Sequence, residues 1–237
     1  MSVNHIPFKD YNRSNEVLHI LYAAKTVNIQ SLSKIGIQKI FYLANLLSPV
    51  KEIVLATIRF VSHYRGPYSK EIQNTVDHLT ALGYVEIEDF IVHNHKYSIA
   101  KYSLSDAGES VVNKLVEYSK ENEKQWWYSI LIQVSNIYSN EEIFEEHSSY
   151  DGFDHIVDLV YKDSTYLSIK NSQDFRKFID TSDPSTPTYK LIEFVKKFIV
   201  TQDLQVERTD EKRIAELVII SFFEFLYSKY IDEFANG

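Results

Sequence analysis

Two histidines close together are the first residues that could carry chemistry. His93 and His95 flank Asn94, and the residues on both sides of this tripeptide have the pattern of short strands. Imidazole nitrogens at this spacing can bind a metal ion, but a zinc site needs three or four protein ligands and no third ligand is evident. We therefore expect a polar turn here and no bound metal.

A second pattern is similar to the core of a restriction-type nuclease. Such a core places an acidic residue on one strand and Glu-x-Lys on the next, so that two carboxylates hold magnesium. Here Asp158 is followed by Ser168-Ile169-Lys170, and serine stands where the second carboxylate is needed. Pairing of two strands in a small subdomain explains the same pattern. A divergent magnesium-dependent nuclease that uses Asp158 and Lys170 remains our third functional hypothesis.

Other common catalytic patterns are missing from the sequence. There is no cysteine, so thiol catalysis, disulfides and thiolate metal sites are excluded. We find no nucleophile elbow for a serine hydrolase, and the six glycines form no phosphate-binding loop. Trp126-Trp127 opens a helical apolar stripe, which indicates core packing rather than a stacking platform. The sequence predicts a protein that is not an enzyme and has no cofactor.

Composition and charge indicate a folded, acidic chain. The 237 residues include 17 Tyr and 14 Phe and carry a net charge of −8. Residues 51–120 contain eight Lys/Arg against nine Asp/Glu, so they lack the positive excess that neutralises phosphates. The absence of cysteine suits a reducing cytosol, and the N-terminus has no signal-peptide pattern. The longest apolar tract, 217–231, contains Glu224 and Lys229 and is too short for a bilayer. We expect a cytoplasmic protein that binds proteins and contacts DNA only indirectly.

The stretch 64–108 determines how the rest of the chain is organised. Gly66-Pro67 predicts a turn after a helix over residues 51–63, and Ser69 is placed to cap a helix over 69–82. Gly83 supplies the left-handed residue that ends this helix. Two short strands follow, and Ser105 can cap the next helix. This order is typical of a winged helix-turn-helix with a β-hairpin wing.

The two strands of the predicted wing can be aligned residue by residue. The alignment pairs Val85 with Leu104, Ile87 with Tyr102, Glu88 with Lys101, Phe90 with Ile99 and Val92 with Tyr97. In a regular strand, Val85 and Ile87 would then face away from Phe90 and Val92. Either a bulge near Asp89 restores one face, or the tip carries an apolar patch that a partner covers. We predict a partner-binding site at this tip, formed by Phe90, Val92, Tyr97 and Ile99.

The remaining sequence is mostly helical in pattern. We expect an irregular arm over 1–13, helices beginning near Ser14 and after Ser33, and a charged run over 117–125 that forms a solvated helix end or a hinge. Residues 151–170 fit either a hairpin or two short helices, and a helix is expected over 174–180. Later helices include Leu191 and follow Asp210. The predicted class is mainly α (α+β), with a winged-helix domain at 1–120 and a helical C-terminal domain at 121–237.

Several short motifs resemble a set of bacterial winged-helix proteins. The matching residues are Leu32, Ile37, Gln38, Lys39, Tyr64, Gly66, Pro67, Tyr68, Ser69, Leu82 and Gly83. The set includes YwgA-like proteins, Panacea antitoxin domains and the middle components of ABC three-component defence systems, and the resemblance covers roughly residues 14–115. It implies an accessory or adaptor subunit beside an SMC-like ATPase and an effector, and it marks Tyr64 and Gly66–Ser69 as a structural or contact motif.

Three functional hypotheses follow. The first is a non-enzymatic adaptor of an anti-phage or anti-plasmid complex, acting through protein partners or as a homodimer. The second is a winged-helix regulator or antitoxin that binds DNA or a toxin, which needs a basic face. The third is the divergent nuclease. Fold analogy by itself does not choose among them.

Overall fold

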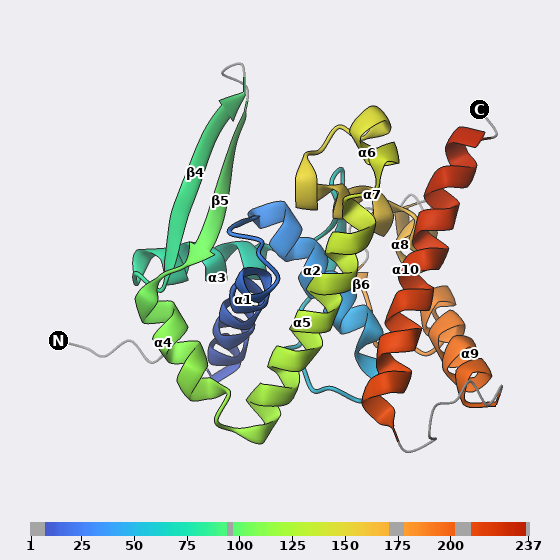
Figure 1. Cartoon of the computed structure of the whole chain (residues 1–237), viewed down its shortest axis with the longest axis horizontal. Coiled ribbons are helices and arrows are strands. Elements are labelled where there is room, and N and C mark those ends of the chain that lie inside the picture. Colours follow the sequence, from blue (N-terminus) through green and yellow to red (C-terminus); the bar gives the residue numbers. More distant parts are fainter. Residues whose placement is uncertain (1–7, 94–96, 171–177, 202–209, 236–237) are drawn as a thin grey trace.

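The computed structural model describes residues 8–93, 97–170, 178–201 and 210–235. The chain is mainly helical, with two small antiparallel sheets (Figure 1). The longer helices are α1 (Phe8–Thr26), α2 (Lys34–Leu47), α3 (Lys70–Ala81), α4 (Asp106–Leu115), α5 (Ser119–Ser139), α9 (Pro187–Thr201) and α10 (Glu211–Ala235). Shorter helices are η1 (Ser48–Val50), α6 (Glu142–His147), η2 (Gly152–His155), α7 (Ile156–Tyr161) and α8 (Ser164–Lys170).

Two three-stranded sheets accompany the helices. The first has the order β1-β5-β4, from β1 (Leu32–Ser33), β4 (Val85–His93) and β5 (Tyr97–Leu104). The second has the order β3-β2-β6, from β2 (Phe60–His63), β3 (Gly66–Tyr68) and β6 (Phe178–Ile179). Every pairing is antiparallel, and β1 and β6 join strands that are distant in sequence.

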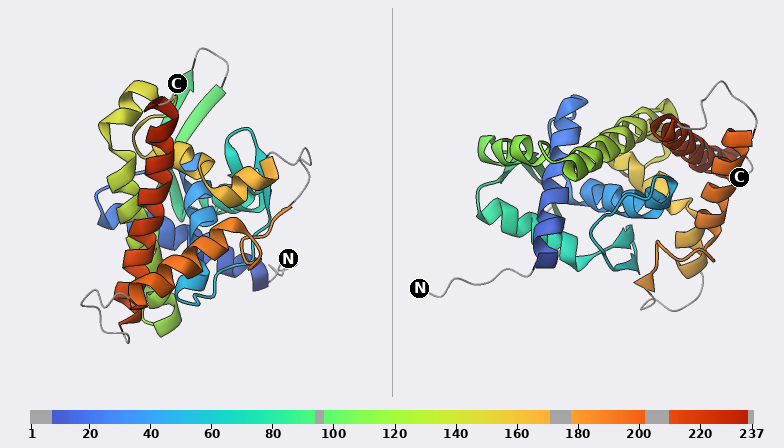
Figure 2. Two further views of the ribbon diagram at one scale, coloured as in Figure 1. Left: turned by 90° about the vertical axis from the view of Figure 1, so that its right-hand side faces the viewer. Right: turned by 90° about the horizontal axis from the view of Figure 1, so that it is seen from below.

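Helix α2 lies at the centre of the molecule. Its residues Gly36–Ala44 are all buried, and it lies between α1 and α10 with α5 alongside (Figure 2). The Ser33 hydroxyl accepts a hydrogen bond from the Gly36 backbone N–H at 3.0 Å, which confirms the predicted cap. The predicted cap of Ser105 is confirmed in the same way by a bond from the Gly108 N–H, and Asp210, where the last helix was expected to start, accepts a bond from the Arg213 N–H.

The helix predicted over residues 51–63 is wrong. Residues 53–59 form no helix, and β2 and β3 make a hairpin. Ile58 and Phe60 are buried, whereas Val54, expected in the core, is 82% exposed. Ile58 and Phe60 are buried and Arg59 between them is exposed, which is the two-residue periodicity of a strand. A short run rich in Ile, Val and Thr is compatible with both strand and helix periodicity. Gly66 has φ +85, which turns the chain into β3.

Other boundaries also differ from the predictions. Helix α1 begins at Phe8, so the irregular arm predicted over 1–13 is wrong from that residue onward. Residues 178–179 form β6 rather than the end of a helix, and 174–177 lie outside the described residues. Of the two alternatives for 151–170, the structure has two short helices, α7 and α8. Gly83 has φ +76 just after α3, as predicted.

One cluster of buried hydrophobic residues extends across residue 120. It includes Val17 of α1, Phe41 of α2, Trp127 of α5 and Phe223 of α10. Of the two alternatives for the charged run 117–125, the structure has the helix end: α5 begins at Ser119 and residues 117–120 are exposed, although Lys124 is buried against α1. The division at residue 120 stays a prediction. No helix within the described ranges has both the length and the apolar character of a membrane span.

Candidate functional site

The β4–β5 hairpin carries the predicted partner-binding residues and extends away from the helices (Figure 1). Val85 pairs with Leu104 and Ile87 with Tyr102, as predicted. The register then shifts between Ile87 and Asp89, so of the two alternatives that the sequence left open the structure has the bulge. Beyond the bulge the predicted pairs are wrong: Lys101 lies opposite Asp89, Phe90 opposite Ala100, Ile99 opposite Ile91, Val92 opposite Ser98 and Tyr97 opposite His93.

The bulge gives the hairpin one continuous apolar face. Ala100 and Tyr102 are two residues apart on β5, so their partners Phe90 and Ile87 lie on the same side of the sheet. Val85 and Tyr102 are buried at the base of this face, whereas Ile87 is 50% and Phe90 65% exposed. Ile87 therefore lies on the same side of the sheet as Phe90 and outside the buried core.

Of the other three predicted tip residues, Ile99 does not join Phe90 on this face. The backbone of Ile99 is one residue from Ala100, so its half-buried side chain is on the opposite side. The side chains of Val92 and Tyr97 lie outside the described residues. The same holds for the side chain of His93 and for all of His95. The apolar patch is therefore Ile87 and Phe90, which we call the hairpin patch.

The outer face of α3, the helix that precedes the β4–β5 hairpin, carries both positive and negative charges. Its Asp77 carboxylate accepts a hydrogen bond from Lys34, and its Glu71 carboxylate accepts one from Arg13. Lys70 contributes a positive charge on the same side, but the charges of Arg13 and Lys34 are paired with these two carboxylates. This face offers little positive charge to a phosphate backbone.

The motif residues Gly66–Ser69 meet Gln38 and Lys39 in space. The Gln38 side chain forms two hydrogen bonds with the Ser69 backbone, accepting from its N–H at 2.9 Å and donating to its carbonyl at 2.8 Å. The Lys39 ammonium donates to the Pro67 carbonyl at 2.9 Å, and burial lowers its pKa to about 7. Four of the eleven residues that carry the resemblance thus connect α2 to the chain at the end of β3.

Ser69 does not cap α3 as predicted. It occupies the N-cap position, but its hydroxyl is buried and has no hydrogen-bond partner among the described residues. The Gln38 amide holds its backbone instead. Tyr64, in contrast, is 73% exposed, and its ring lies 4.2 Å from that of His63. Within the motif, Tyr64 is available for contact, whereas the buried Gly66, Pro67 and Ser69 are structural.

The nuclease pattern is placed on helices rather than strands. Asp158 is on α7 and accepts a hydrogen bond from Ser148 at 2.5 Å, while burial raises the pKa of its carboxyl group. Lys170 ends α8, where its ammonium lies 4.8 Å from the Tyr161 ring centre. Among the described residues, no group of three His, Asp or Glu is arranged to hold a metal ion. The strand layout that the nuclease hypothesis needs is not present.

A buried polar network between α1 and α5 was missed by the sequence analysis. Glu16 is fully buried and accepts hydrogen bonds from the Ala56 N–H at 2.7 Å and the Tyr128 hydroxyl at 2.9 Å. Lys124 lies 3.9 Å from Glu16 and 2.9 Å from Glu121, whose other contact is the His19 ring at 2.9 Å. The sequence signal that could have revealed the network is the charged residue Glu16 within an apolar helical stripe, because a buried charge needs partners.

The network shifts the pKa values of Glu16 and Glu121 in opposite directions. Burial raises the pKa of Glu16 to about 7, and this effect outweighs its hydrogen bonds and the Lys124 charge. Hydrogen bonds from His19 and then Lys124 lower the pKa of Glu121 to about 2. Glu16 ties α1 to α5 and to the segment before β2. It has no access to solvent, so we assign it to folding rather than to ligand binding.

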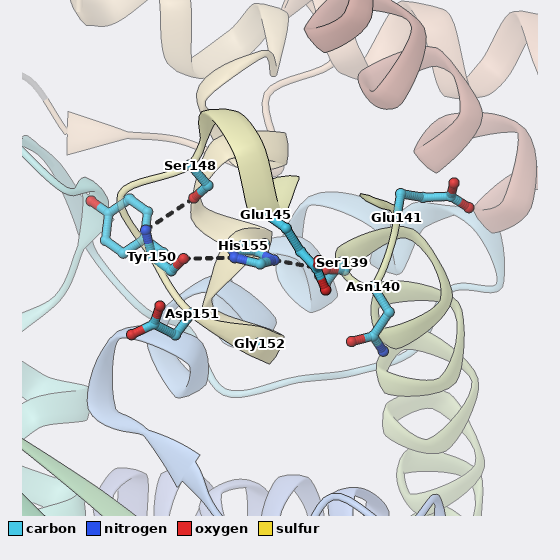
Figure 3. A pocket seen from close by; sticks show the side chains of 9 residues that line it. All are labelled: Ser139, Asn140, Glu141, Glu145, Ser148, Tyr150, Asp151, Gly152 and His155. Atoms are coloured by element: carbon cyan, nitrogen blue, oxygen red, sulfur yellow. Dashed lines mark hydrogen bonds between the residues drawn. The ribbon is translucent and has the colours of Figure 1, made fainter. Parts of the chain in front are cut away.

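A polar pocket of about 310 Å³ opens between the C-terminal end of α5, α6 and the loop that leads into η2 (Figure 3). The residues that line it are Ser139, Asn140, Glu141, Glu145, Ser148, Tyr150, Asp151, Gly152 and His155. None of them was singled out from the sequence, since they lie in three elements whose meeting depends on the fold.

The comparisons with known proteins add no family to this geometry. No family model matches the chain, and no curated protein matches it.

Proposed function

We propose that this chain is a non-enzymatic adaptor subunit that binds a protein partner through the hairpin patch. The observation that carries the proposal is the exposure of Ile87 and Phe90 on one face of a projecting hairpin. Full burial of such a side chain contributes about 1.5–3 kcal/mol, and Ile87 and Phe90 are 50% and 65% exposed, so covering the patch would add about 2–3 kcal/mol to an interface. Aromatic anchors of this kind are common at the centre of protein interfaces.

We further propose that residues 1–120 are a winged-helix unit. The order α1-β1-α2-α3-β4-β5 and the sheet order β1-β5-β4 support this proposal, with β4–β5 as the wing. One departure is the segment with the β2–β3 hairpin, which separates α2 from α3. Because α3 is pinned through this hairpin by Gln38 and Lys39, the unit remains tied together.

The partner chemistry favours protein over DNA. The chain carries a net charge of −8, and the acids on α3 pair with nearby cations. Duplex DNA binding gains most of its affinity from phosphate neutralisation, which this surface does not supply. Together with the resemblance described above, this supports a cytoplasmic subunit of a bacterial defence complex that bridges an SMC-like ATPase and its effector. A regulator or antitoxin role is the alternative.

Co-purification with the products of neighbouring genes tests the proposal. We expect the wild-type chain to form a stoichiometric complex, and the double variant Ile87→Ser with Phe90→Ser to remain folded but lose it. Glu86→Ala is the matched control, because Glu86 is exposed on the opposite face of the same strand. Light scattering on the isolated chain distinguishes a homodimer from a heteromeric complex.

Two results would contradict the proposal. One is retention of the partner by the double variant with unchanged affinity. The other is tight, steeply salt-dependent binding of duplex DNA by the isolated chain, which would favour the regulator hypothesis.

A further inference from the structure

The pocket at the C-terminal end of α5 is a second site, separate from the hairpin patch. Its lining carries three carboxylates, Glu141, Glu145 and Asp151, and a single histidine. Glu141 accepts a hydrogen bond from the Tyr227 hydroxyl at 3.2 Å. The carboxylates of Glu145 and Asp151 have no hydrogen-bond or ion-pair partner within the described ranges. The charge of the lining is therefore negative even when the histidine is protonated.

His155 holds two walls of this pocket together. Its Nδ1 lies 2.9 Å from the Ser139 carbonyl at the end of α5, and its Nε2 lies 2.6 Å from the Tyr150 carbonyl in the loop (Figure 3). Each ring nitrogen therefore lies within hydrogen-bond distance of a backbone carbonyl oxygen in a different wall. The ring also stacks on Phe144 of α6 at 5.3 Å, which connects the third element.

The loop wall is fixed independently of His155. The Ser148 hydroxyl accepts a hydrogen bond from the Tyr150 N–H at 3.0 Å and donates one to Asp158 at 2.5 Å. Gly152 then turns the chain with φ +54 into η2. These contacts hold the pocket open without a ligand, and such preorganisation reduces the cost of binding.

A buried hydroxyl in the lining has no partner. Ser139 is 0% exposed, its side chain lines the pocket, and its hydroxyl makes no hydrogen bond within the described part of the chain. A buried polar group without a partner is uncommon, and leaving it unsatisfied is costly. A ligand with several N–H donors would give this oxygen a partner as well as neutralise the carboxylates.

We propose that this pocket binds an organic cation, an ammonium or guanidinium group, between Glu145 and Asp151. A metal ion is disfavoured because the described acids and histidines form no cluster that could coordinate one. The volume of about 310 Å³ accommodates a group of this size with part of its aliphatic stem. The cation belongs either to a free small molecule or to a basic side chain of a partner protein.

Titrations followed by amide chemical shifts test the proposal on the full chain. The probes are agmatine for a free cation, N-acetylarginine amide for a side chain, and N-acetylcitrulline amide as the neutral analogue. We expect at least one cationic probe to shift the amides of 139–155 and the neutral analogue to leave them unchanged. Binding of N-acetylarginine amide as tightly as agmatine indicates a partner side chain, and binding of agmatine alone indicates a free ligand.

Substitutions at exposed residues show whether the binding depends on this pocket. Glu145→Gln with Asp151→Asn should weaken the binding at least tenfold. Glu146→Gln removes a neighbouring exposed charge that does not line the pocket, and it should have no effect. Equal binding of the neutral analogue, equal loss in the Glu146 variant, or no shift at about 10 mM probe would overturn the proposal. The hairpin variants should bind the cation normally, so the two proposals can fail separately.

Discussion

Replacing Glu16 by glutamine should remove a large pH-dependent term from the stability of this protein. Burial raises the pKa of the Glu16 carboxyl group from 4.5 to about 7 in the folded chain. Between these values the folded protein keeps a proton that the unfolded chain releases. The stabilisation is therefore complete below pH 4.5 and is lost as the pH rises through 7. At about 1.4 kcal/mol for each pKa unit, the loss reaches about 3 kcal/mol above pH 8.

Glutamine is the neutral isostere of the protonated acid. Its carbonyl can accept from the Ala56 N–H, and its amide can donate to the Tyr128 oxygen, so both contacts of Glu16 persist. We expect Glu16→Gln to match the wild type near pH 4.5 and to be more stable by about 3 kcal/mol near pH 8.5. Urea unfolding followed by circular dichroism at several pH values measures this difference.

A matched control is Glu117→Gln, which removes a carboxylate from an exposed position between α4 and α5. Its difference from the wild type should stay small and constant with pH. If the Glu16 variant shows the same pH dependence as the wild type, Glu16 is not the titrating group. If it is less stable at every pH, the native carboxyl is ionised and held by Lys124 at 3.9 Å, and the argument from burial fails.

Four further substitutions test individual contacts. Ser69→Ala should not destabilise the chain, because it removes a buried hydroxyl that has no partner among the described residues. Ser105→Ala should cost about 1 kcal/mol through loss of its cap. Equal losses would show that Ser69 caps α3. Gly108→Ala should cost about 1–3 kcal/mol in the same assay, since a Cβ would lie 2.2 Å from the Tyr84 carbonyl oxygen; an unchanged stability would contradict this packing. Burial lowers the pKa of Lys39 from 10.5 to about 7, so the wild type loses stability as the pH falls through 7. The stability of the Lys39→Met variant relative to the wild type should therefore rise as the pH falls from 9 to 6. A constant difference would show that Lys39 is charged throughout.

Local signals in the sequence determined several elements correctly. Helix α2 follows from the Ser33 cap and its apolar stripe, and α4 follows from the Ser105 cap. Both signals act within a few residues, so they need no knowledge of the fold. The conflict between the faces of Ile87 and Phe90 left a bulge as one of two alternatives, because strand alternation is a local rule, and only the structure chose the bulge.

Tertiary structure decided the features that depend on distant partners. Residues 53–63 became an extended segment and a strand because β2 pairs with β3 and β6, and pairing with β6 joins residues more than a hundred positions apart. The Ser69 backbone bonds Gln38 instead of using its own hydroxyl. Glu16 and the walls of the pocket at Ser139 and His155 acquire their properties only from burial and contact across elements. Sequence patterns report which side chains share a face, whereas desolvation and hydrogen bonding depend on what the folded chain places beside them.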